Sequence, residues 1–227
     1  MNSQEFISKL SELGIPVFGV EAASTILGKP RSYAALYLLR LFKAKKIERV
    51  EKGKYYLPGT QLNTIASRLV PDSYISLYSA LEYYALTTQI PKEIAIITIR
   101  YHKSIIINGR RIRFYKVKKG LIYGYVSFAN GPVIAEPEKI FIDDLYLHGR
   151  LYFSEEFEYA IKRGKLNIEK LCSYAIRSKK RSIASLLGYY LEKLGVNADV
   201  LIPYRSPSYI RLAKNGLLNS RWHIYGD

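Results

Sequence analysis

Residue types that build disulfides and metal sites are scarce in this sequence. Its 227 residues include one cysteine, Cys172, and three histidines, His102, His148 and His223. A single thiol excludes an internal disulfide framework and an all-cysteine zinc site. The histidines are too far apart for a metal-binding motif. We therefore expect no metal and no cofactor, and such cysteine usage suits a reducing compartment.

Long apolar runs and catalytic motifs are also missing. No stretch approaches the ~18 uninterrupted apolar residues of a membrane span, and the N-terminal MNSQEFISKL lacks the order of a secretory signal. There is no Walker loop and no Gly-x-Ser-x-Gly motif. Asp143 and Asp144 are adjacent on a predicted helix, so they point in different directions and one of them caps or is solvated. Cys172 fits a buried structural thiol, and Trp222 fits a core or interface anchor. We predict a soluble, cytoplasmic protein that is not an enzyme and does not enter a membrane.

Acidic residues are few, and the excess of basic residues is uneven. The chain has 35 Lys and Arg against 19 Asp and Glu, a formal charge of +16. Residues 1–62 carry 10 basic and 5 acidic side chains, residues 63–135 carry 10 and 3, and residues 136–227 carry 15 and 11. This charge favours a polyanion as partner. A basic surface without such a partner is the alternative.

The first 59 residues have the element order of a winged helix-turn-helix. Apolar spacing predicts helices at about 3–13, 20–27 and 31–44, with a capping box from Asn2 to Glu5 and a turn at Gly28 before Pro30. Two short alternating runs, KIERV and KYYL, follow and are separated by Glu51-Lys52-Gly53, which indicates a hairpin. This hairpin is the predicted wing.

The third helix and the wing supply the candidate DNA-binding residues. In a helix-turn-helix the third helix places its N-terminal residues at base edges in the major groove. Arg31 suits bidentate recognition of guanine, whereas residues farther along the helix and on the wing suit phosphates. Solvated charges on a small three-helix module are the alternative. The predicted set is Lys29, Arg31, Ser32, Tyr33, Arg40, Lys43, Arg49, Lys52 and Lys54, with Leu36 on the same face.

A linking helix at 60–71 leads to a mixed domain, 72–227, which has a small sheet followed by a helical half, so the fold class is α+β. We expect a helix at 73–86, then strands that include a hairpin at Asn108-Gly109. Helices are expected at about 136–147, 155–163, 168–177 and 181–194. On the strand after the hairpin, Arg111, Arg113 and Tyr115 share one face, with Ile112 and Phe114 on the other.

Three interpretations of that basic strand face remain open. It is most simply the solvent-exposed side of the sheet. Alternatively, Arg110–Lys119 binds RNA or another nucleic acid, or it contacts an acidic protein. A protein-interaction scaffold whose charge is incidental is a further hypothesis, and it predicts weak binding that disappears at physiological salt.

The second domain resembles AbiEi, the antitoxin component of the AbiE system. The similar segments are SYISLYSALEYYALTTQIP, IAIITIRYHKSIIINGRRIRFYKV and VIAEPEKIFIDDLYL, and the resemblance continues to the terminal NSRWHIYGD. Its most characteristic parts are Tyr74–Leu81 and Glu136–Lys139. In one departure from this type of fold, Lys45-Lys46 stands where a glycine commonly follows the third helix, so a lysine must be left-handed there or the helix ends differently.

The resemblance implies functions that the residue patterns do not show. It implies a repressor that binds repeats in double-stranded DNA upstream of its own operon. It also implies an antitoxin that counteracts a nucleotidyltransferase-like toxin without a stable complex, within an abortive-infection, antiviral defence system. A monomer and a homodimer are both compatible with this expectation.

Overall fold

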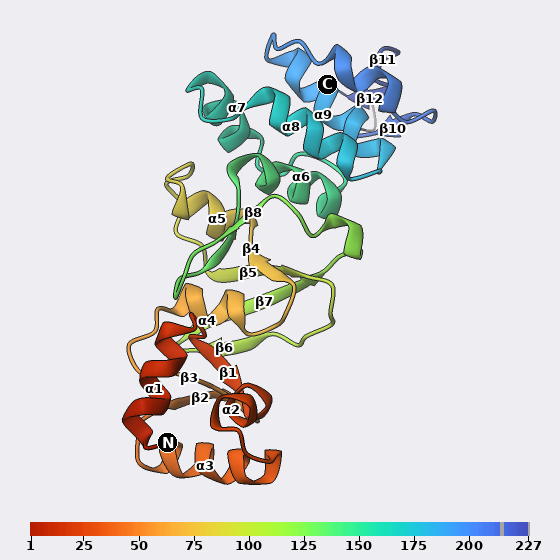
Figure 1. The fold of residues 1–227 in the computed structure, drawn as a ribbon. Coiled ribbons are helices and arrows are strands. Elements are labelled where there is room, and N and C mark those ends of the chain that lie inside the picture. The colour runs from red at the N-terminus through yellow and green to blue at the C-terminus, as the bar shows by residue number, and fades with distance from the viewer. Residues whose placement is uncertain (214–215, 227) are drawn as a thin grey trace. The chain divides into compact units, whose positions relative to one another are not determined.

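The described part of the chain contains both helices and strands, and the fold is mixed α+β, as the sequence predicts (Figure 1). The computed structural model describes residues 1–213 and 216–226. The chain forms two units and crosses between them several times. The first unit comprises Met1–Ile75, Lys92–Val117 and Val126–Ile134, and the second comprises Ser76–Pro91, Lys118–Tyr125 and Ala135–Asp227.

The first unit begins with three helices and a three-stranded sheet of order β1-β3-β2. Their bounds are α1 (Ser3–Glu12), α2 (Val20–Leu27), α3 (Arg31–Lys43), β1 (Val17–Gly19), β2 (Glu48–Glu51) and β3 (Lys54–Tyr56). The sequence analysis did not find β1, because a strand of three residues is too short to show an alternating pattern. These elements enclose an apolar core, which contains Phe6, Leu10, Phe18, Ala23, Ala34, Leu38, Leu41, Ile47 and Tyr55.

Local signals fix the ends of these helices. Asn2 Oδ1 accepts a hydrogen bond from the Glu5 backbone N–H at 2.9 Å, and Glu5 Oε2 accepts one from the Asn2 backbone N–H at 3.0 Å, which confirms the capping box. Gly28 ends α2 in the left-handed conformation, with a φ of 61°. Lys45 follows α3 with a φ of 55°. A lysine there costs about 1 kcal/mol relative to glycine, as the sequence led us to expect.

A six-stranded sheet of order β6-β7-β5-β4-β9-β8 is the larger sheet of the chain's described part. Its strands are β4 (Ser73–Ile75), β5 (Glu93–Thr98), β6 (Ile105–Ile107), β7 (Arg110–Lys116), β8 (Tyr125–Ser127) and β9 (Val133–Ala135). Helix α4 (Leu62–Arg68) packs on β4 and β5. The hairpin at Asn108-Gly109 is confirmed: both residues have positive φ, 50° and 78°, as a type I′ turn requires.

The predicted helix at 73–86 is wrong at its start. Ser73–Ile75 form β4, and the helix α5 begins only at Leu77 (Leu77–Tyr83). Tyr74 and Ile75 are fully buried, and β4 pairs with β5 on one side and β9 on the other. A central strand that is buried on both faces lacks the alternation of a half-exposed strand, so its apolar residues were read as one face of a helix.

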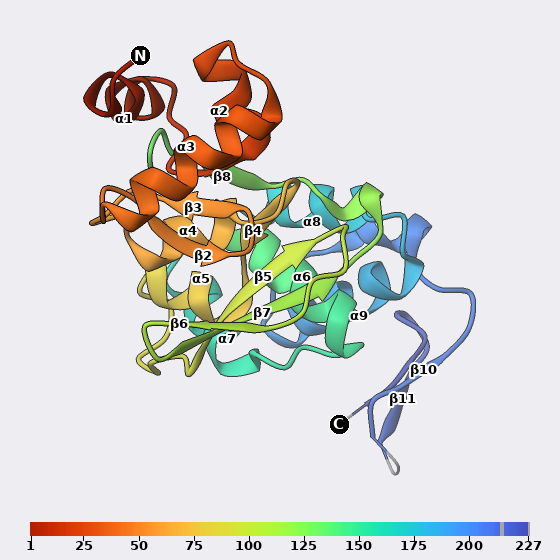
Figure 2. The same cartoon turned by 90° about the horizontal axis from the view of Figure 1, so that it is seen from below.

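The second unit is mostly helical and ends in a small sheet (Figure 2). It contains α5 and the elements η1 (Lys119–Leu121), α6 (Pro137–His148), α7 (Ser154–Lys162), α8 (Ile168–Arg177), α9 (Arg181–Lys193), η2 (Asp199–Tyr204), β10 (Ile210–Arg211), β11 (Leu217–Asn219) and β12 (Ile224–Gly226). The three-stranded sheet, of order β10-β12-β11, and η2 were not predicted. They lie in a tail rich in proline, arginine and tyrosine, whose composition shows no periodic pattern.

Helix α6 buries charged side chains. Lys139 is fully buried, its Nζ donates to Asp143 Oδ1, and Nζ lies 4.8 Å from the centre of the Tyr123 ring. Burial lowers the pKa of Lys139, and Asp143 opposes that shift. Asp144 accepts backbone hydrogen bonds from Tyr152 at 2.8 Å and from Phe153 at 3.1 Å. Asp144 therefore caps a turn, as expected for one of the two aspartates, but neither is solvated, since both are at least 98% buried.

The single tryptophan anchors the C-terminal segment to α9. Trp222 is 1% exposed, which confirms a core anchor, and its Nε1 donates to Glu192. Its ring lies against Gly188, where an added Cβ would come within 2.2 Å of a ring carbon. Only glycine allows this approach. Cys172, at 3% exposed, is a buried thiol as expected, and burial raises its pKa to about 11.

Replacement of Gly188 by alanine should lower the free energy of unfolding of the second unit by about 1–3 kcal/mol, because the methyl group overpacks the site. Urea denaturation followed by the fluorescence of Trp222 measures this. The matched control is Gly120→Ala, where nothing lies within 4 Å of an added Cβ. The control should change stability by no more than about 0.5 kcal/mol. Equal stability of the two variants would contradict the close contact.

Candidate nucleic-acid interface

The inner face of α3 determines which of its side chains face solvent. Ala34 and Leu38 are fully buried, and Leu41 is 6% exposed, as the helical spacing predicts. Tyr37 and Phe42 pack on the same core and are half-buried. The opposite face is exposed and consists of Arg31, Ser32, Tyr33, Ala35, Leu36, Leu39, Arg40 and Lys43. Residues 22–47 contain six lysines and arginines and no aspartate or glutamate, so this face lacks acidic residues of its own.

The N-terminal end of α3 presents the candidate base-reading residues. Ser24 Oγ donates to the Lys29 carbonyl at 2.6 Å, which fixes the turn between α2 and α3. Lys29 and Ser32 are exposed. Tyr33 is 47% exposed, and its ring is stacked on Tyr37 with a centroid distance of 6.4 Å. The stacking orients the Tyr33 hydroxyl and leaves it free to contact a phosphate or a base edge.

Arg31 has an acidic partner that the sequence analysis did not foresee. Its Nη1 lies 2.6 Å from Glu21 Oε1 of α2, and the two side chains are 72% and 69% exposed. An exposed pair of this kind contributes at most about 1 kcal/mol. A phosphate or a guanine can therefore replace Glu21 at little cost.

Apolar side chains lie between the cations on the outer face of α3. Leu36 is 56% exposed and Leu39 is 38% exposed. With Tyr33 they form an apolar strip along a helix whose ends are basic. In a major groove such side chains contact thymine methyl groups. Leu39 was missed because exposure of a leucine is not visible in a helical pattern that assigns apolar residues to the core.

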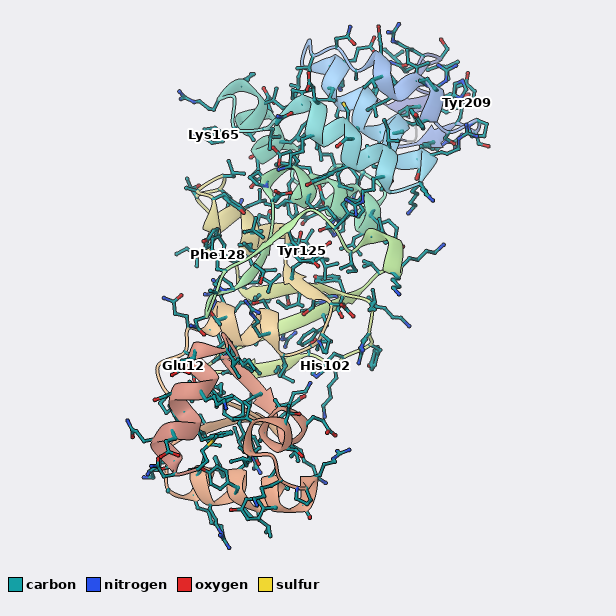
Figure 3. The ribbon with its side chains drawn as sticks, viewed as in Figure 1. Glu12, His102, Tyr125, Phe128, Lys165 and Tyr209 are labelled. Atoms are coloured by element: carbon teal, nitrogen blue, oxygen red, sulfur yellow. The ribbon has the colours of Figure 1, made fainter. Side chains whose placement is uncertain are left out.

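The two lysines of the β2–β3 hairpin differ: one is exposed to solvent and the other makes contacts within the first unit. Lys52 is exposed at the turn. Lys54 is only half-exposed, because its Nζ donates to the Leu69 carbonyl at 2.8 Å and pairs with Glu51 Oε1 at 2.9 Å. Glu51 Oε2 also lies 3.2 Å from Nε2 of His102, a residue that is labelled in Figure 3. Lys54 thus holds the hairpin to the rest of the first unit, a role that competes with the predicted contact to DNA.

The remaining cations of the predicted set lie near the C-terminal end of α3. Arg40 and Lys43 are exposed in its last turn. The guanidinium carbon of Arg49, on β2, lies 5.0 Å from the centre of the Phe42 ring of α3. This contact places a residue of the β2–β3 hairpin beside the helix. The structure therefore brings Arg40, Lys43 and Arg49 to one end of α3, and Lys29 and Arg31 to the other.

The second basic face lies on β7, as expected, and it has an acidic neighbour. Ile112 is fully buried, whereas Arg111 and Arg113 are exposed on the other face. Glu93 Oε1 accepts a hydrogen bond from the Tyr115 hydroxyl at 3.1 Å and lies 3.6 Å from Arg113 Nη1. Burial raises the pKa of Tyr115, and Glu93 adds to the shift. Glu93 offsets part of the charge of this face.

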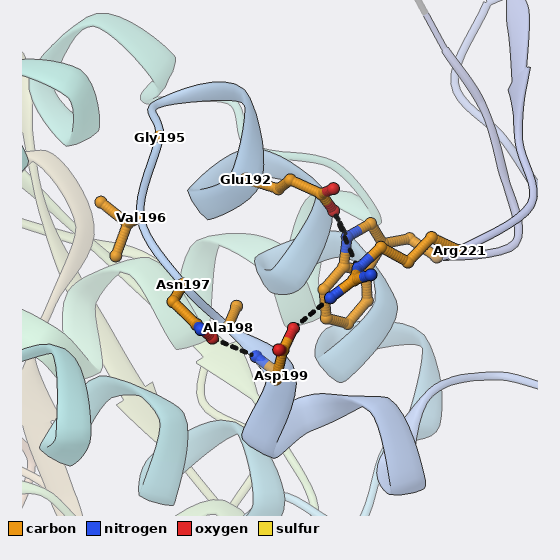
Figure 4. Close-up of a pocket in the computed structure, with 8 residues that line it drawn as sticks. Glu192, Gly195, Val196, Asn197, Ala198, Asp199 and Arg221 are labelled. Atoms are coloured by element: carbon orange, nitrogen blue, oxygen red, sulfur yellow. Dashed lines mark hydrogen bonds and ion pairs between the residues drawn. The ribbon is translucent and has the colours of Figure 1, made fainter.

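The pocket of Figure 4 lies beside the C-terminal anchor and has a volume of about 300 Å³. Arg221 pairs there with both Glu192 and Asp199, and Trp222 donates to Glu192. Its charged groups are therefore already paired with one another. Within residues 1–213 and 216–226, no group of three or more His, Cys, Asp or Glu is arranged to hold a metal ion.

No protein-family model and no curated protein matches the chain. The chain is similar in fold to the crystal structure of the RV2827C protein from Mycobacterium tuberculosis, with a TM-score of 0.52 and 12% sequence identity. The similarity covers 98% of this chain and 90% of that one. At this identity it shows the fold alone. Among the residues that the structure describes, no helix has the length and apolar character needed to cross a membrane.

The contacts of Lys54 with the Leu69 carbonyl and Glu51 predict that this lysine stabilises the first unit. Lys54→Met should lower the free energy of unfolding by about 1 kcal/mol, because the Leu69 carbonyl and Glu51 lose a charged donor. Lys52→Met replaces a lysine that is exposed at the turn of the hairpin, and it should leave stability within about 0.5 kcal/mol. Thermal unfolding followed by circular dichroism compares the two. A larger loss for Lys52→Met would show that the roles of the two lysines are reversed.

Proposed function

We propose that residues 1–59 form a winged helix-turn-helix that binds double-stranded DNA, with α3 in the major groove and the β2–β3 hairpin as the wing. The element order α1-β1-α2-α3-β2-β3 and the sheet order β1-β3-β2 support this assignment. The observation that carries it is the outer face of α3, which is exposed, basic at both ends and without acidic residues of its own. Such a face matches a groove lined by phosphates.

The contacts divide by position. Arg31, Ser32 and Tyr33 lie at the N-terminal end of α3, where a recognition helix meets base edges. Arg40 and Lys43, with Arg49 and Lys52 of the wing, are placed for phosphates and give salt-dependent affinity without sequence preference. Lys54 contributes by holding the wing in position, through Leu69 and Glu51.

We further propose that the protein is a repressor of its own operon and an antitoxin. This part rests on the resemblance to AbiEi and on the basic α3 face, since operator binding requires a DNA-binding module. The partner implied by the resemblance is a nucleotidyltransferase-like toxin. An RNA-binding role for the Arg110–Lys119 face is weaker, because Glu93 offsets part of its charge.

DNA binding can be measured by fluorescence anisotropy over a salt series. The probes are a duplex from immediately upstream of the reading frame and a scrambled duplex of the same composition. We expect the protein to prefer the upstream duplex by about a thousandfold or more. Equal and steeply salt-dependent binding to both would contradict a specific repressor.

Variants separate the two kinds of contact. Arg49→Ala with Lys52→Ala should weaken binding to both duplexes alike and make the salt slope shallower by about two units. Arg31→Ala should instead reduce the preference for the upstream duplex by about tenfold or more, as loss of a base contact does. Arg113→Ala is the control of equal charge and should change neither. A larger effect of Arg113→Ala than of Arg31→Ala would favour the β7 face.

The antitoxin proposal has a separate test. Co-expression with a nucleotidyltransferase-like protein encoded next to this gene should restore growth that the toxin alone arrests. Arg31→Ala should still restore growth, because antitoxicity is assigned to the C-terminal domain by the resemblance. Growth arrest in the presence of the intact protein would remove the antitoxin role while leaving the DNA-binding proposal in place.

A further inference from the structure

Six exposed cations gather in the second unit without acidic partners. They come from the start of η1 and from the turn between α8 and α9, and they are Lys118, Lys119, Arg177, Lys179, Lys180 and Arg181. None of the six forms an ion pair with a carboxylate in the described part of the chain. By contrast, Lys139, Lys162, Lys170 and Arg221 of the same unit all have acidic partners. We call these six residues the α8–α9 cation cluster.

Aromatic contacts hold the two segments of the cluster together. The Tyr123 hydroxyl donates to the Tyr174 carbonyl of α8 at 2.7 Å. The guanidinium carbon of Arg177 lies 4.4 Å from the centre of the Tyr123 ring. Burial lowers the pKa of Lys180, and the charge of Lys118 adds to that shift, so Lys118 lies near the start of α9. Helix α8 also packs on α6 and α9, which fixes the turn between α8 and α9 (Figure 1).

Several of these cations stand where they destabilise the fold. Lys179 has a φ of 54°, a conformation that costs a lysine about 1 kcal/mol relative to glycine. The next residue, Lys180, begins α9 without a side-chain cap, and the first turn of α9 has no acidic residue. Cations at a helix N-terminus are unfavourable. Positions 179–181 therefore combine like-charge repulsion, backbone strain and an unfavourable helix dipole, which a bound polyanion would offset.

Tyrosine rings lie among the cations. Lys180 Nζ is 4.2 Å from the centre of the Tyr146 ring, which is half-buried. Arg181 Nη2 donates to the Pro203 carbonyl at 3.5 Å, and the next residue, Tyr204, is 45% exposed. An exposed aromatic ring near cations that have no acidic partner is an arrangement that binds single-stranded nucleic acids, because phosphates meet the charges and an unstacked base meets the ring. The bases of a duplex stay stacked on one another, so they do not stack on tyrosine rings.

We propose that the α8–α9 cation cluster binds single-stranded nucleic acid, with the basic side chains on phosphates and Tyr204 stacked on a base. This site is separate from the residues of α3 and goes beyond the proposed binding of duplex DNA. RNA and single-stranded DNA share the required chemistry, a phosphodiester backbone with accessible bases.

The test uses the full chain and fluorescein-labelled twelve-nucleotide oligo(U) and oligo(dT), with a twelve-base-pair duplex for comparison, at about 150 mM salt. We expect both single strands to bind more tightly than the duplex once Arg31→Ala and Lys52→Ala have removed the proposed duplex contacts. Tighter binding of oligo(U) than of oligo(dT) would identify RNA as the source, and the reverse would identify DNA. Either result supports the proposal.

The charge test replaces Lys179, Lys180 and Arg181 together by glutamine. Binding of the single strands should weaken at least tenfold, and the salt slope should become shallower by about two units, since each phosphate contact contributes about 0.7. The matched control replaces Lys162, at the end of α7, and Arg163 and Lys165, in the turn that follows it, by glutamine. It removes the same charge at the position labelled Lys165 in Figure 3 and should change binding less than twofold.

The stacking test compares Tyr204→Leu with Tyr204→Phe. The leucine variant should bind about five- to tenfold more weakly, and the phenylalanine variant, which keeps the ring, should bind like the parent protein. If the triple glutamine variant does not fold, Lys179→Gly removes one cation from a position that favours glycine, and it should weaken binding two- to threefold while remaining folded by circular dichroism.

Three outcomes would overturn the proposal. Equal weakening by the triple variant and its control would mean that only net charge matters. Binding of the duplex at least as tight as that of both single strands, with no effect of Tyr204→Leu, would make the cluster a duplex contact. No binding of any oligonucleotide at about 150 mM salt would leave an acidic protein as the partner. None of these outcomes bears on the binding of α3 to upstream DNA, because the Arg31 and Lys52 variants report on that separately.

Discussion

Burial of one face of α3 is the constraint on which the N-terminal module depends. Ala34, Leu38 and Leu41 enter the same core as Phe6, so the helix has one allowed rotation about its axis. The cations of α3 that are proposed to contact DNA owe their exposure to that rotation, because side chains on the face opposite the core point to solvent. The core therefore also positions the exposed face of α3, so a change at Leu38 would move that face as well as weaken the fold.

The structure sorts the basic residues of this chain into two groups. Lys139 and Lys170 pair with buried or half-buried carboxylates, and Lys54 donates a hydrogen bond to a backbone carbonyl. The charges of these lysines therefore take part in contacts within the fold. In the part of the chain that the structure describes, cations without a carboxylate partner include Arg40 and Lys43 of α3, Lys45 just after it, and the residues of the α8–α9 cation cluster. Lys45 and Lys179 belong to this second group, and both have positive φ. A lysine at such a φ carries a backbone cost of about 1 kcal/mol, which a glycine would avoid.

Sequence reasoning succeeded where local rules decide. The capping box at Asn2, the type I′ turn at Asn108-Gly109 and the inner face of α3 depend on neighbouring residues only, and all three are present. It failed where distant contacts decide. Tyr74 and Ile75 form a central strand because β5 and β9 flank them, and no local pattern records those partners. For the same reason the sequence indicated the individual residues of the candidate interface but not their contacts. The ion pair of Arg31 with Glu21 and the hydrogen bond from Lys54 to the Leu69 carbonyl were not predicted.

The buried charges of α6 show why total charge is a poor guide to function. Lys139 is completely buried, and Asp143 and the Tyr123 ring stabilise its charge at that depth in place of water. Arg177 lies over the same Tyr123 ring from the outside, 4.4 Å from its centre. The Tyr123 ring therefore contacts two cations: Lys139, which is buried and paired with Asp143, and Arg177, which is exposed and has no acidic partner among the described residues. Lys139 and Arg177 differ in that a carboxylate pairs with Lys139 and none in the described part of the chain pairs with Arg177. The amino-acid composition does not show such pairing, whereas the structure does.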